Sequence, residues 1–249
     1  NTSPRTSTNL MLWATIFGDR TLVDVVPSAV SPIAMLGTYC ITAAHVRSRV
    51  VALGASVVVM TVPAAVLMLR SSYVDVTVMA AFVAAAHYSL RPDLRPRDAW
   101  MAALGIGLAC GTKANQIAFG AVLFSILVVR MIALAVREKR GRHLVHPLGG
   151  LLLVLALAAP DYVRSYLDHD NPVWPMRIDS ERLGLHLPGP YDIQDMQWPL
   201  DQMLHEMYDV PSQGQDYADT RRHAYGYGLT YLGLPLVFLA LVTLVFGLP

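Results

Sequence analysis

Residues 99–136 read AWMAALGIGLACGTKANQIAFGAVLFSILVVRMIALAV and contain only two charged side chains, Lys113 and Arg130. As one helix this stretch would be about 57 Å long, nearly twice the thickness of the hydrocarbon core of a bilayer. A Gly-Thr-Lys turn that ends at Lys113 is the natural break. The sequence therefore predicts two membrane passes, near 99–112 and 115–136, with small residues suited to helix packing.

Uncharged runs of similar length recur along the chain. Of its 249 residues, 54% are hydrophobic and only 15% are charged, which is more apolar than an average soluble domain. Together with the two passes above, the runs predict an all-α, polytopic transmembrane bundle of about seven helices in a lipid bilayer. The other predicted spans cover residues 25–46, 50–69, 73–90, 146–166 and 229–247.

The basic residues test this count of spans. Nine of the 19 Lys and Arg residues lie in three predicted loops, at 47–49, 91–97 and 137–142. With two passes inside 99–136 all three loops fall on one side of the membrane, whereas a single pass would place the second and third on opposite sides. Basic loops gather on the cytoplasmic side of multispanning proteins. We therefore predict a multi-pass protein of the bacterial inner membrane, with these loops in the cytoplasm.

The remaining segments are predicted to lie outside or to complete the bundle. Residues 1–24 form the tail of an extracytoplasmic loop, in which 7–18 is an interfacial helix because it is apolar but too short to span. Residues 25–167 form a bundle of six spans, and 229–249 hold the seventh. Between them, 168–228 carries eleven acidic residues together with aromatic residues and prolines. This segment is predicted to form an extracytoplasmic loop or cap.

Three charged residues sit where a charge is costly, at the outer ends of predicted spans. Asp75 is either a first-turn carboxylate favoured by the helix dipole or a group that coordinates a cation or orients a sugar. Lys113 either extends to the interface or meets a lipid-linked phosphate. Arg164 either pairs with Asp161 within its helix or binds phosphate. The sequence places one acid and two bases at one level of the membrane.

Several kinds of site are not indicated. Cys40 and Cys110 lie inside apolar runs, where a thiol is typically a small packing residue. The histidines of 168–228 are too far apart to resemble a zinc motif, so no metal ligands are assigned. No nucleotide-binding loop, nucleophile elbow or basic nucleic-acid patch is present. A nucleic-acid partner and soluble nucleotide chemistry are therefore not predicted.

Several short stretches, taken in order, resemble one enzyme family. They are GDRTLVDVVPSAVSPIAMLG (18–37), RSSYVD (70–75), GIGLACGTKANQIAFG (105–120), RSYLDHDNPVWP (164–175) and AYGYGLTYLGLP (224–235). In this order they resemble the polytopic type C glycosyltransferases that use polyprenyl-phosphate-linked sugars, the family 39 or dolichyl-phosphate-mannose-transferase-like group.

The resemblance implies transfer of a sugar from a polyprenyl-phosphate carrier to a glycan, lipid or protein acceptor at the extracytoplasmic face. It assigns Asp75 a catalytic role as the acid at the outer start of the family's fourth span. It assigns substrate binding to Lys113, as the Lys of a Thr-Lys turn, and to Arg164 and Asn171, around an Asn-Pro turn. No cofactor is implied apart from a divalent cation as an option.

The family's main catalytic acid lies in the first outer loop. Here the first full span resembles the family's second, and Asp19 and Asp24 match the juxtamembrane connection after that loop. We therefore expect the main acid upstream of residue 1 and the chain to be an internal piece, inactive alone.

Two other classes of function remain open. A transporter or a flippase of lipid-linked glycans would also span the membrane many times, but it typically has broken helices, midplane charges and two related halves. The sequence shows neither an inverted repeat nor a mid-span carboxylate. A structural membrane subunit is the third option, and it leaves the acidic, aromatic outer segment unexplained.

Overall fold

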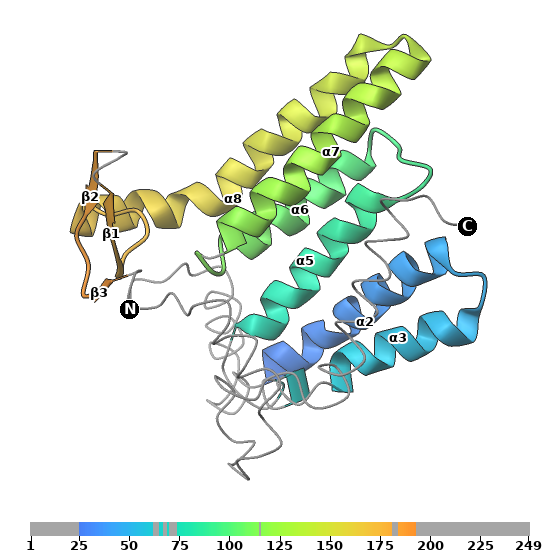
Figure 1. Ribbon diagram of the computed structural model, residues 1–249, viewed down its shortest axis with the longest axis horizontal. Coiled ribbons are helices and arrows are strands. Elements are labelled where there is room, and N and C mark those ends of the chain that lie inside the picture. Colours follow the sequence, from blue (N-terminus) through green and yellow to red (C-terminus); the bar gives the residue numbers. More distant parts are fainter. Residues whose placement is uncertain are drawn as a thin grey trace.

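The computed structural model describes residues 25–61, 65–66, 69, 74–114, 116–180 and 184–192 (Figure 1). The predicted interfacial helix at 7–18, most of the predicted outer segment at 168–228 and the predicted last span at 229–247 lie outside these residues.

The described chain is mostly helical. Its α-helices are α2 (Val25–His45), α3 (Arg49–Thr61), α5 (Asp75–Leu90), α6 (Asp98–Cys110), α7 (Gln116–Glu138) and α8 (Val145–His169), and a short 3-10 helix, η2 (Gly141–Leu144), precedes α8. The break predicted inside 99–136 is confirmed, because α6 ends at Cys110 and α7 begins at Gln116.

Three of these helices are long and apolar enough to cross a membrane: α2, α7 and the continuous Gly141–His169 unit of η2 and α8. Helices α3, α5 and α6 are apolar but shorter. The expectation of a helical membrane protein is therefore supported by three helices, which is fewer than the number of spans predicted from the sequence.

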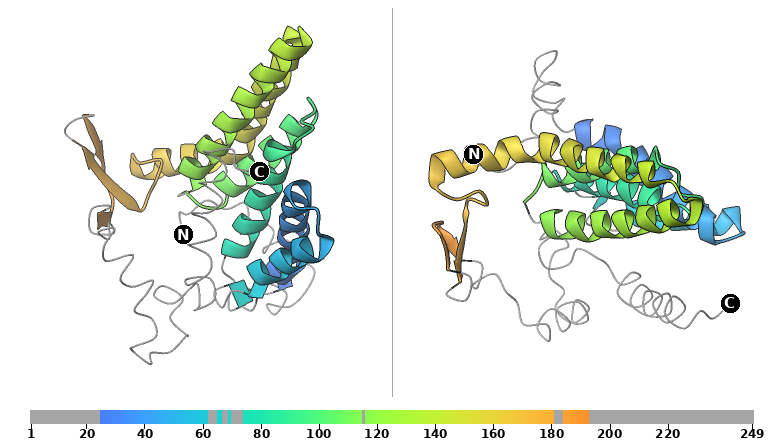
Figure 2. Two further views of the ribbon diagram at one scale, coloured as in Figure 1. Left: turned by 45° about the vertical axis from the view of Figure 1, so that its right-hand side comes forward. Right: turned by 90° about the horizontal axis from the view of Figure 1, so that it is seen from above.

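The helices alternate in direction and pack side by side (Figures 1 and 2). Helix α2 packs against α3 and α5, α5 packs against α6, and α6 packs against α8, while α7 contacts α6 and α5. Helix α6 is central, and nine of its 13 residues are buried. Its small residues allow this packing: a Cβ on Gly105 would lie 2.6 Å from the Ala81 carbonyl oxygen of α5.

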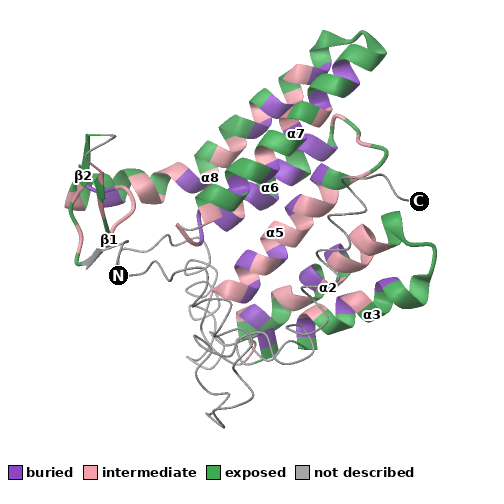
Figure 3. Cartoon of the chain, viewed as in Figure 1, coloured by how far each residue is buried: buried purple, intermediate pink, exposed green. Residues whose placement is uncertain are grey.

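Many positions on the outside of the bundle are exposed (Figure 3), and large apolar side chains occupy many of them. Val129 and Val136 on α7 are 64% and 72% exposed, and Leu152 and Leu167 on α8 are 69% and 74% exposed. A soluble monomer rarely exposes apolar side chains this densely. Helices α7 and α8 therefore present surfaces suited to lipid.

The basic loops lie at one end of the bundle. The connections 46–48, 91–97 and 139–144 join neighbouring antiparallel helices at the same end (Figure 1). We call this end, defined by these three connections, the basic end. The turn between α6 and α7 and the start of α5 lie at the opposite end.

The middle connection of the basic end is held by carboxylates. Asp98, which begins α6 and is 1% exposed, accepts hydrogen bonds from the Arg95 backbone N–H at 2.8 Å and from the Arg91 guanidinium at 3.3 Å. Asp93 pairs with Arg91 at 3.3 Å and with Arg95 at 3.5 Å. Its own backbone N–H, and then the Arg91 charge, hold the pKa of the Asp93 carboxyl below its ordinary value. Two arginines of this loop are thus neutralised locally.

A small sheet follows α8 and was not predicted from the sequence. Strand β1 (Met176–Ser180) lies between β2 (Leu185–Leu187) and β3 (Tyr191–Asp192). It pairs antiparallel with β2, with Ile178 opposite Leu187, and parallel with β3, with Met176 opposite Tyr191. The all-α prediction is therefore wrong for this part of the outer segment, although the rest of the described chain is helical.

Candidate functional site

Asp75 and Lys113 form an ion pair although 38 residues separate them in the chain. Asp75 opens α5, and Lys113 lies in the turn between α6 and α7. Their side chains are 30% and 40% exposed. The structure thus brings an acid and a base together at the end of the bundle opposite the basic end, where a ligand can reach both.

The turn that carries Lys113 is tied to the last turn of α6. The backbone N–H of Lys113 donates to the Ala109 carbonyl at 3.1 Å, and the buried Thr112 hydroxyl donates to the Leu108 carbonyl at 2.7 Å. These bonds satisfy carbonyl groups that a helix end otherwise leaves without a partner. The backbone that carries the ammonium group is therefore well defined.

Asp75 also has a local reason for its position. It lies in the first turn of α5, where the positive end of the helix dipole favours a carboxylate. The first-turn interpretation of Asp75 is therefore supported. The ion pair with Lys113 is an additional contact between helices, so Asp75 links the start of α5 to the turn after α6.

Arg164 lies at the same end of the bundle, without a described contact to this pair. The Tyr162 hydroxyl donates to the Cys110 carbonyl at 2.7 Å, which places this part of α8 level with the end of α6. Arg164 follows two residues later and is exposed. Within the described residues, no ion pair joins it to Asp75. Its proposed role in phosphate binding stays a prediction.

Asn171 is completely buried, and its side chain organises the loop after α8. Its Nδ2 donates to the carbonyl oxygens of Met176 and Pro188, both at 2.6 Å, and its Oδ1 accepts from the Val173 backbone N–H at 2.9 Å. Buried amides that are satisfied in this way hold backbone segments together. This gives Asn171 a structural role, and the substrate-binding role assigned from the resemblance stays a prediction.

Sequence reasoning missed a groove that residues of α6, α7 and α8 line. Its volume is about 470 Å³, and its walls are almost entirely apolar. Cys110, Ile117 and Tyr162 line the end nearest the turn that carries Lys113. Small residues on the facing helices are the signal in the sequence, because they leave room between side chains: Gly120 and Ala121 on α7, and Ala158 and Ala159 on α8.

Metal binding has no geometric support within the part of the chain that the structure describes. No group of three His, Cys, Asp or Glu side chains there is placed to hold an ion. His186 lies 2.7 Å from Asp179 across two strands, and the His169 ring stacks on Trp174 with ring centroids 4.3 Å apart. The other histidines of the outer segment, at 205 and 223, lie outside the described residues. The optional divalent cation stays a prediction.

Comparisons with known proteins add no assignment to this geometry. No protein-family model, no curated protein and no solved structure matches the chain. A functional proposal therefore depends on the residues themselves and on the resemblance of the short stretches quoted above.

Proposed function

We propose that the chain is the membrane-embedded part of a glycosyltransferase that moves a sugar from a polyprenyl-phosphate carrier to an extracytoplasmic acceptor. The observation that carries this proposal is the Asp75–Lys113 ion pair, which lies at the same end of the bundle as Cys110 and Tyr162 of an apolar groove. A lipid-linked sugar phosphate has the matching parts, namely an apolar chain, an anionic phosphate and a sugar. A purely structural membrane subunit would need neither an exposed ion pair nor an apolar groove at this end of the bundle.

Lys113 is the group suited to the phosphate. A lysine ammonium group acts as a point charge for phosphate oxygens, and a pair that is about one third exposed can exchange partners with a ligand. In the proposed complex the donor phosphate takes the place of Asp75 at Lys113. The Asp75 carboxylate is then released from its ion pair and can accept a hydrogen bond from the acceptor.

The reaction follows from these positions. The acceptor oxygen attacks the anomeric carbon, its proton passes to a carboxylate, and the bond between the sugar and the lipid phosphate breaks. The phosphate leaves with the bonding electrons, and Lys113 stabilises the charge that develops on it. Among the described residues, Asp75 is the carboxylate paired with Lys113, and the proposal assigns the proton to it.

The proposal includes an orientation. In this proposal the end with Asp75 faces outward and the basic end faces the cytoplasm of a bacterial cell. The distribution of basic residues supports this orientation through the positive-inside rule. The acidic composition of 168–228 is in keeping with an outer location.

The test is transfer of a labelled sugar from polyprenyl phosphate in membranes that contain the native protein. We expect Asp75→Asn and Lys113→Gln each to lower the rate about 100-fold, the usual size of such effects. Asp75→Glu and Lys113→Arg, which retain the charges, should recover part of the rate. The site assignment is wrong if Asp75→Asn and Lys113→Gln both transfer at the unmodified rate.

Matched controls come from the basic end. Asp93→Asn and Lys139→Gln remove one exposed charge each and should leave transfer unchanged. The assay also separates the competing class, because a flippase would move the labelled lipid to the other leaflet without consuming acceptor. Movement of this kind, with no transfer product, would replace the enzyme proposal.

A further inference from the structure

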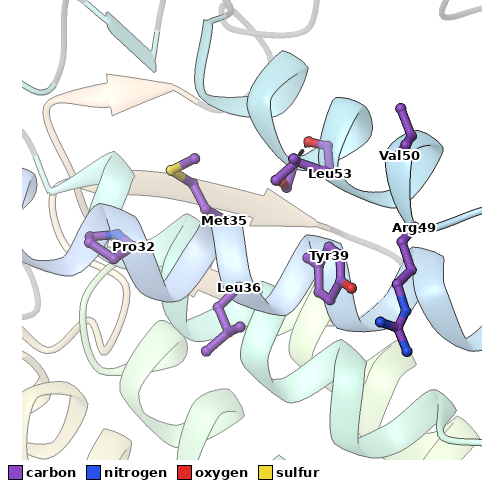
Figure 4. A pocket seen from close by; sticks show the side chains of 8 residues that line it. Pro32, Met35, Leu36, Tyr39, Arg49, Val50 and Leu53 are labelled. Atoms are coloured by element: carbon purple, nitrogen blue, oxygen red, sulfur yellow. Dashed lines mark hydrogen bonds between the residues drawn. The ribbon is translucent and has the colours of Figure 1, made fainter.

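A second groove lies between α2 and α3, away from the Asp75–Lys113 pair. Its volume is about 570 Å³, and its lining is predominantly apolar. From α2 it is lined by side chains at helical spacing, which makes one continuous face: Pro32, Met35, Leu36 and Tyr39. Val50 and Leu53 line it from α3 (Figure 4). Between Pro32 and Tyr39 this face extends about 10 Å along the helix axis.

The groove is charged at one end only. Arg49 and Tyr39 lie together at the end near the α2–α3 connection, and Pro32 lies at the other (Figure 4). Arg49 is the first residue of α3, so its guanidinium group is at the basic end of the bundle. The groove thus has a cationic mouth at the basic end, and its apolar part extends from there along α2 and α3.

The positive charge at this mouth is not neutralised by the hairpin itself. Residues 25–74 contain no Asp or Glu, although Arg47 lies in the α2–α3 connection and Arg49 begins α3. Among the described residues, neither arginine has a carboxylate within ion-pair distance. The next connection differs, because there Arg91 and Arg95 are paired with carboxylates. The α2–α3 mouth is therefore complementary to an anion.

We propose that this groove binds an anionic phospholipid of the leaflet in contact with the basic end. One acyl chain lies along Leu36 and Leu53, and the phosphate accepts hydrogen bonds from the Arg49 guanidinium and the Tyr39 hydroxyl. Basic pockets between membrane helices bind anionic headgroups through this combination of charge and apolar contact. The site is independent of the proposed glycosyltransferase activity, because it uses other residues at the other end of the bundle.

The headgroup contact is tested on the detergent-purified native protein by native mass spectrometry with dioleoyl phosphatidylglycerol and dioleoyl phosphatidylcholine as probes. We expect preferential binding of phosphatidylglycerol. Loss of a charge-assisted hydrogen bond in Arg49→Gln should weaken that binding about tenfold or more. Arg97→Gln is the matched control, since Arg97 is an exposed arginine at the same end of the bundle and does not line the groove. The Arg97→Gln variant should bind phosphatidylglycerol as the unmodified protein does.

The acyl-chain contact has its own matched pair on α3. Leu53 and Val51 are 56% and 53% exposed, but only Leu53 lines the groove. Leu53→Trp should fill the channel and weaken phosphatidylglycerol binding several-fold, whereas Val51→Trp should not. Circular dichroism and gel filtration of each variant verify that it is folded.

Three outcomes would overturn the proposal. Equal loss in Arg49→Gln and Arg97→Gln would mean a general attraction of anionic lipid to the basic end. Equal binding of both lipids would remove the role of charge. No bound lipid in the unmodified protein, with a lowered unfolding temperature in Leu53→Trp, would mean that another part of the chain fills the groove.

Discussion

Arg130 shows how the bundle accommodates a charge on an apolar helix. It lies on α7, and its guanidinium group donates to the Ser89 carbonyl and, at 2.6 Å, to the Arg91 carbonyl. These carbonyls belong to the end of α5, where a helix has no backbone donors left to satisfy them. The positive charge also faces the negative end of the α5 dipole. Arg130 thus acts as a cap supplied by a neighbouring helix.

Replacing Arg130 should therefore lower the stability of the protein. Arg130→Met keeps most of the apolar part of the side chain but leaves both carbonyl groups without this donor. We expect the free energy of unfolding to fall by about 2–4 kcal/mol, because bonds to a charged donor are lost at a partly buried site. Unfolding in detergent, followed by circular dichroism, measures the change. Arg137→Met, at an exposed position on the same helix, should change it by less than about 1 kcal/mol. Equal effects of the two substitutions would contradict the capping role.

The residues of the candidate site differ in how far the sequence could reveal them. Asp75 and Lys113 stand out because each breaks an apolar run, and the alternation of helix direction puts them at one end. The sequence alone cannot distinguish a structural role of Asn171 from ligand binding. The carbonyl groups to which its side chain donates belong to residues up to 17 positions away. The exposure of the Arg164 side chain likewise depends on how α8 packs against the other helices. Contacts of this kind are tertiary and leave no local pattern.

At the scale of elements, the apolar runs predicted most helix ends within a few residues. Helix α6 nevertheless has only 13 residues, about 20 Å, and is shorter than the hydrocarbon core. Its small, buried residues pack against α5 and α8, so the apolar character that resembled a span also serves contacts between helices. The sheet escaped prediction because strands of five, three and two residues are too short for a reliable alternation.

The α5–α6 contact gives a test of this packing. A Cβ on Gly105 would lie 2.6 Å from the Ala81 carbonyl oxygen and 2.9 Å from the Ala85 Cβ. Gly105→Ala should therefore lower the free energy of unfolding by about 1–3 kcal/mol through overpacking. Gly54→Ala on α3 is the matched control, because nothing lies within 4 Å of its added Cβ. It should be neutral or stabilising by up to about 1 kcal/mol, as expected for Ala in a helix. Thermal unfolding of both variants in the same detergent measures these changes. A Gly105→Ala protein at least as stable as the original would rule out the close approach of α5 to α6 at Gly105.

At the scale of the whole molecule, the two ends of the bundle differ in their charged residues. The basic end carries arginines that pair with Asp93 and Asp98, and it carries Arg49 at the mouth of the α2–α3 groove. The opposite end carries the Asp75–Lys113 pair, and the α6–α7–α8 groove extends from Cys110 and Tyr162 along the bundle. Exposed large apolar side chains cover much of the sides between them. This polarity along one axis is what a protein with one face in each compartment requires.

The polarity predicts which positions can be labelled from each side of a membrane. In a background with Cys40→Ala and Cys110→Ala, single cysteines replace Asp93, Arg140 and Asp168, which are exposed. A membrane-impermeant maleimide added to sealed right-side-out vesicles should label Asp168→Cys at once, and Asp93→Cys and Arg140→Cys only after permeabilisation. The reason is that α6 and α7 together return the chain to the side from which it started, so the second and third basic connections share a compartment. Labelling of Asp93→Cys and Arg140→Cys from opposite sides would mean that α6 and α7 do not both cross, and the span count would fall. Labelling of these two before Asp168→Cys would keep the two crossings but invert the orientation, placing the Asp75–Lys113 pair in the cytoplasm.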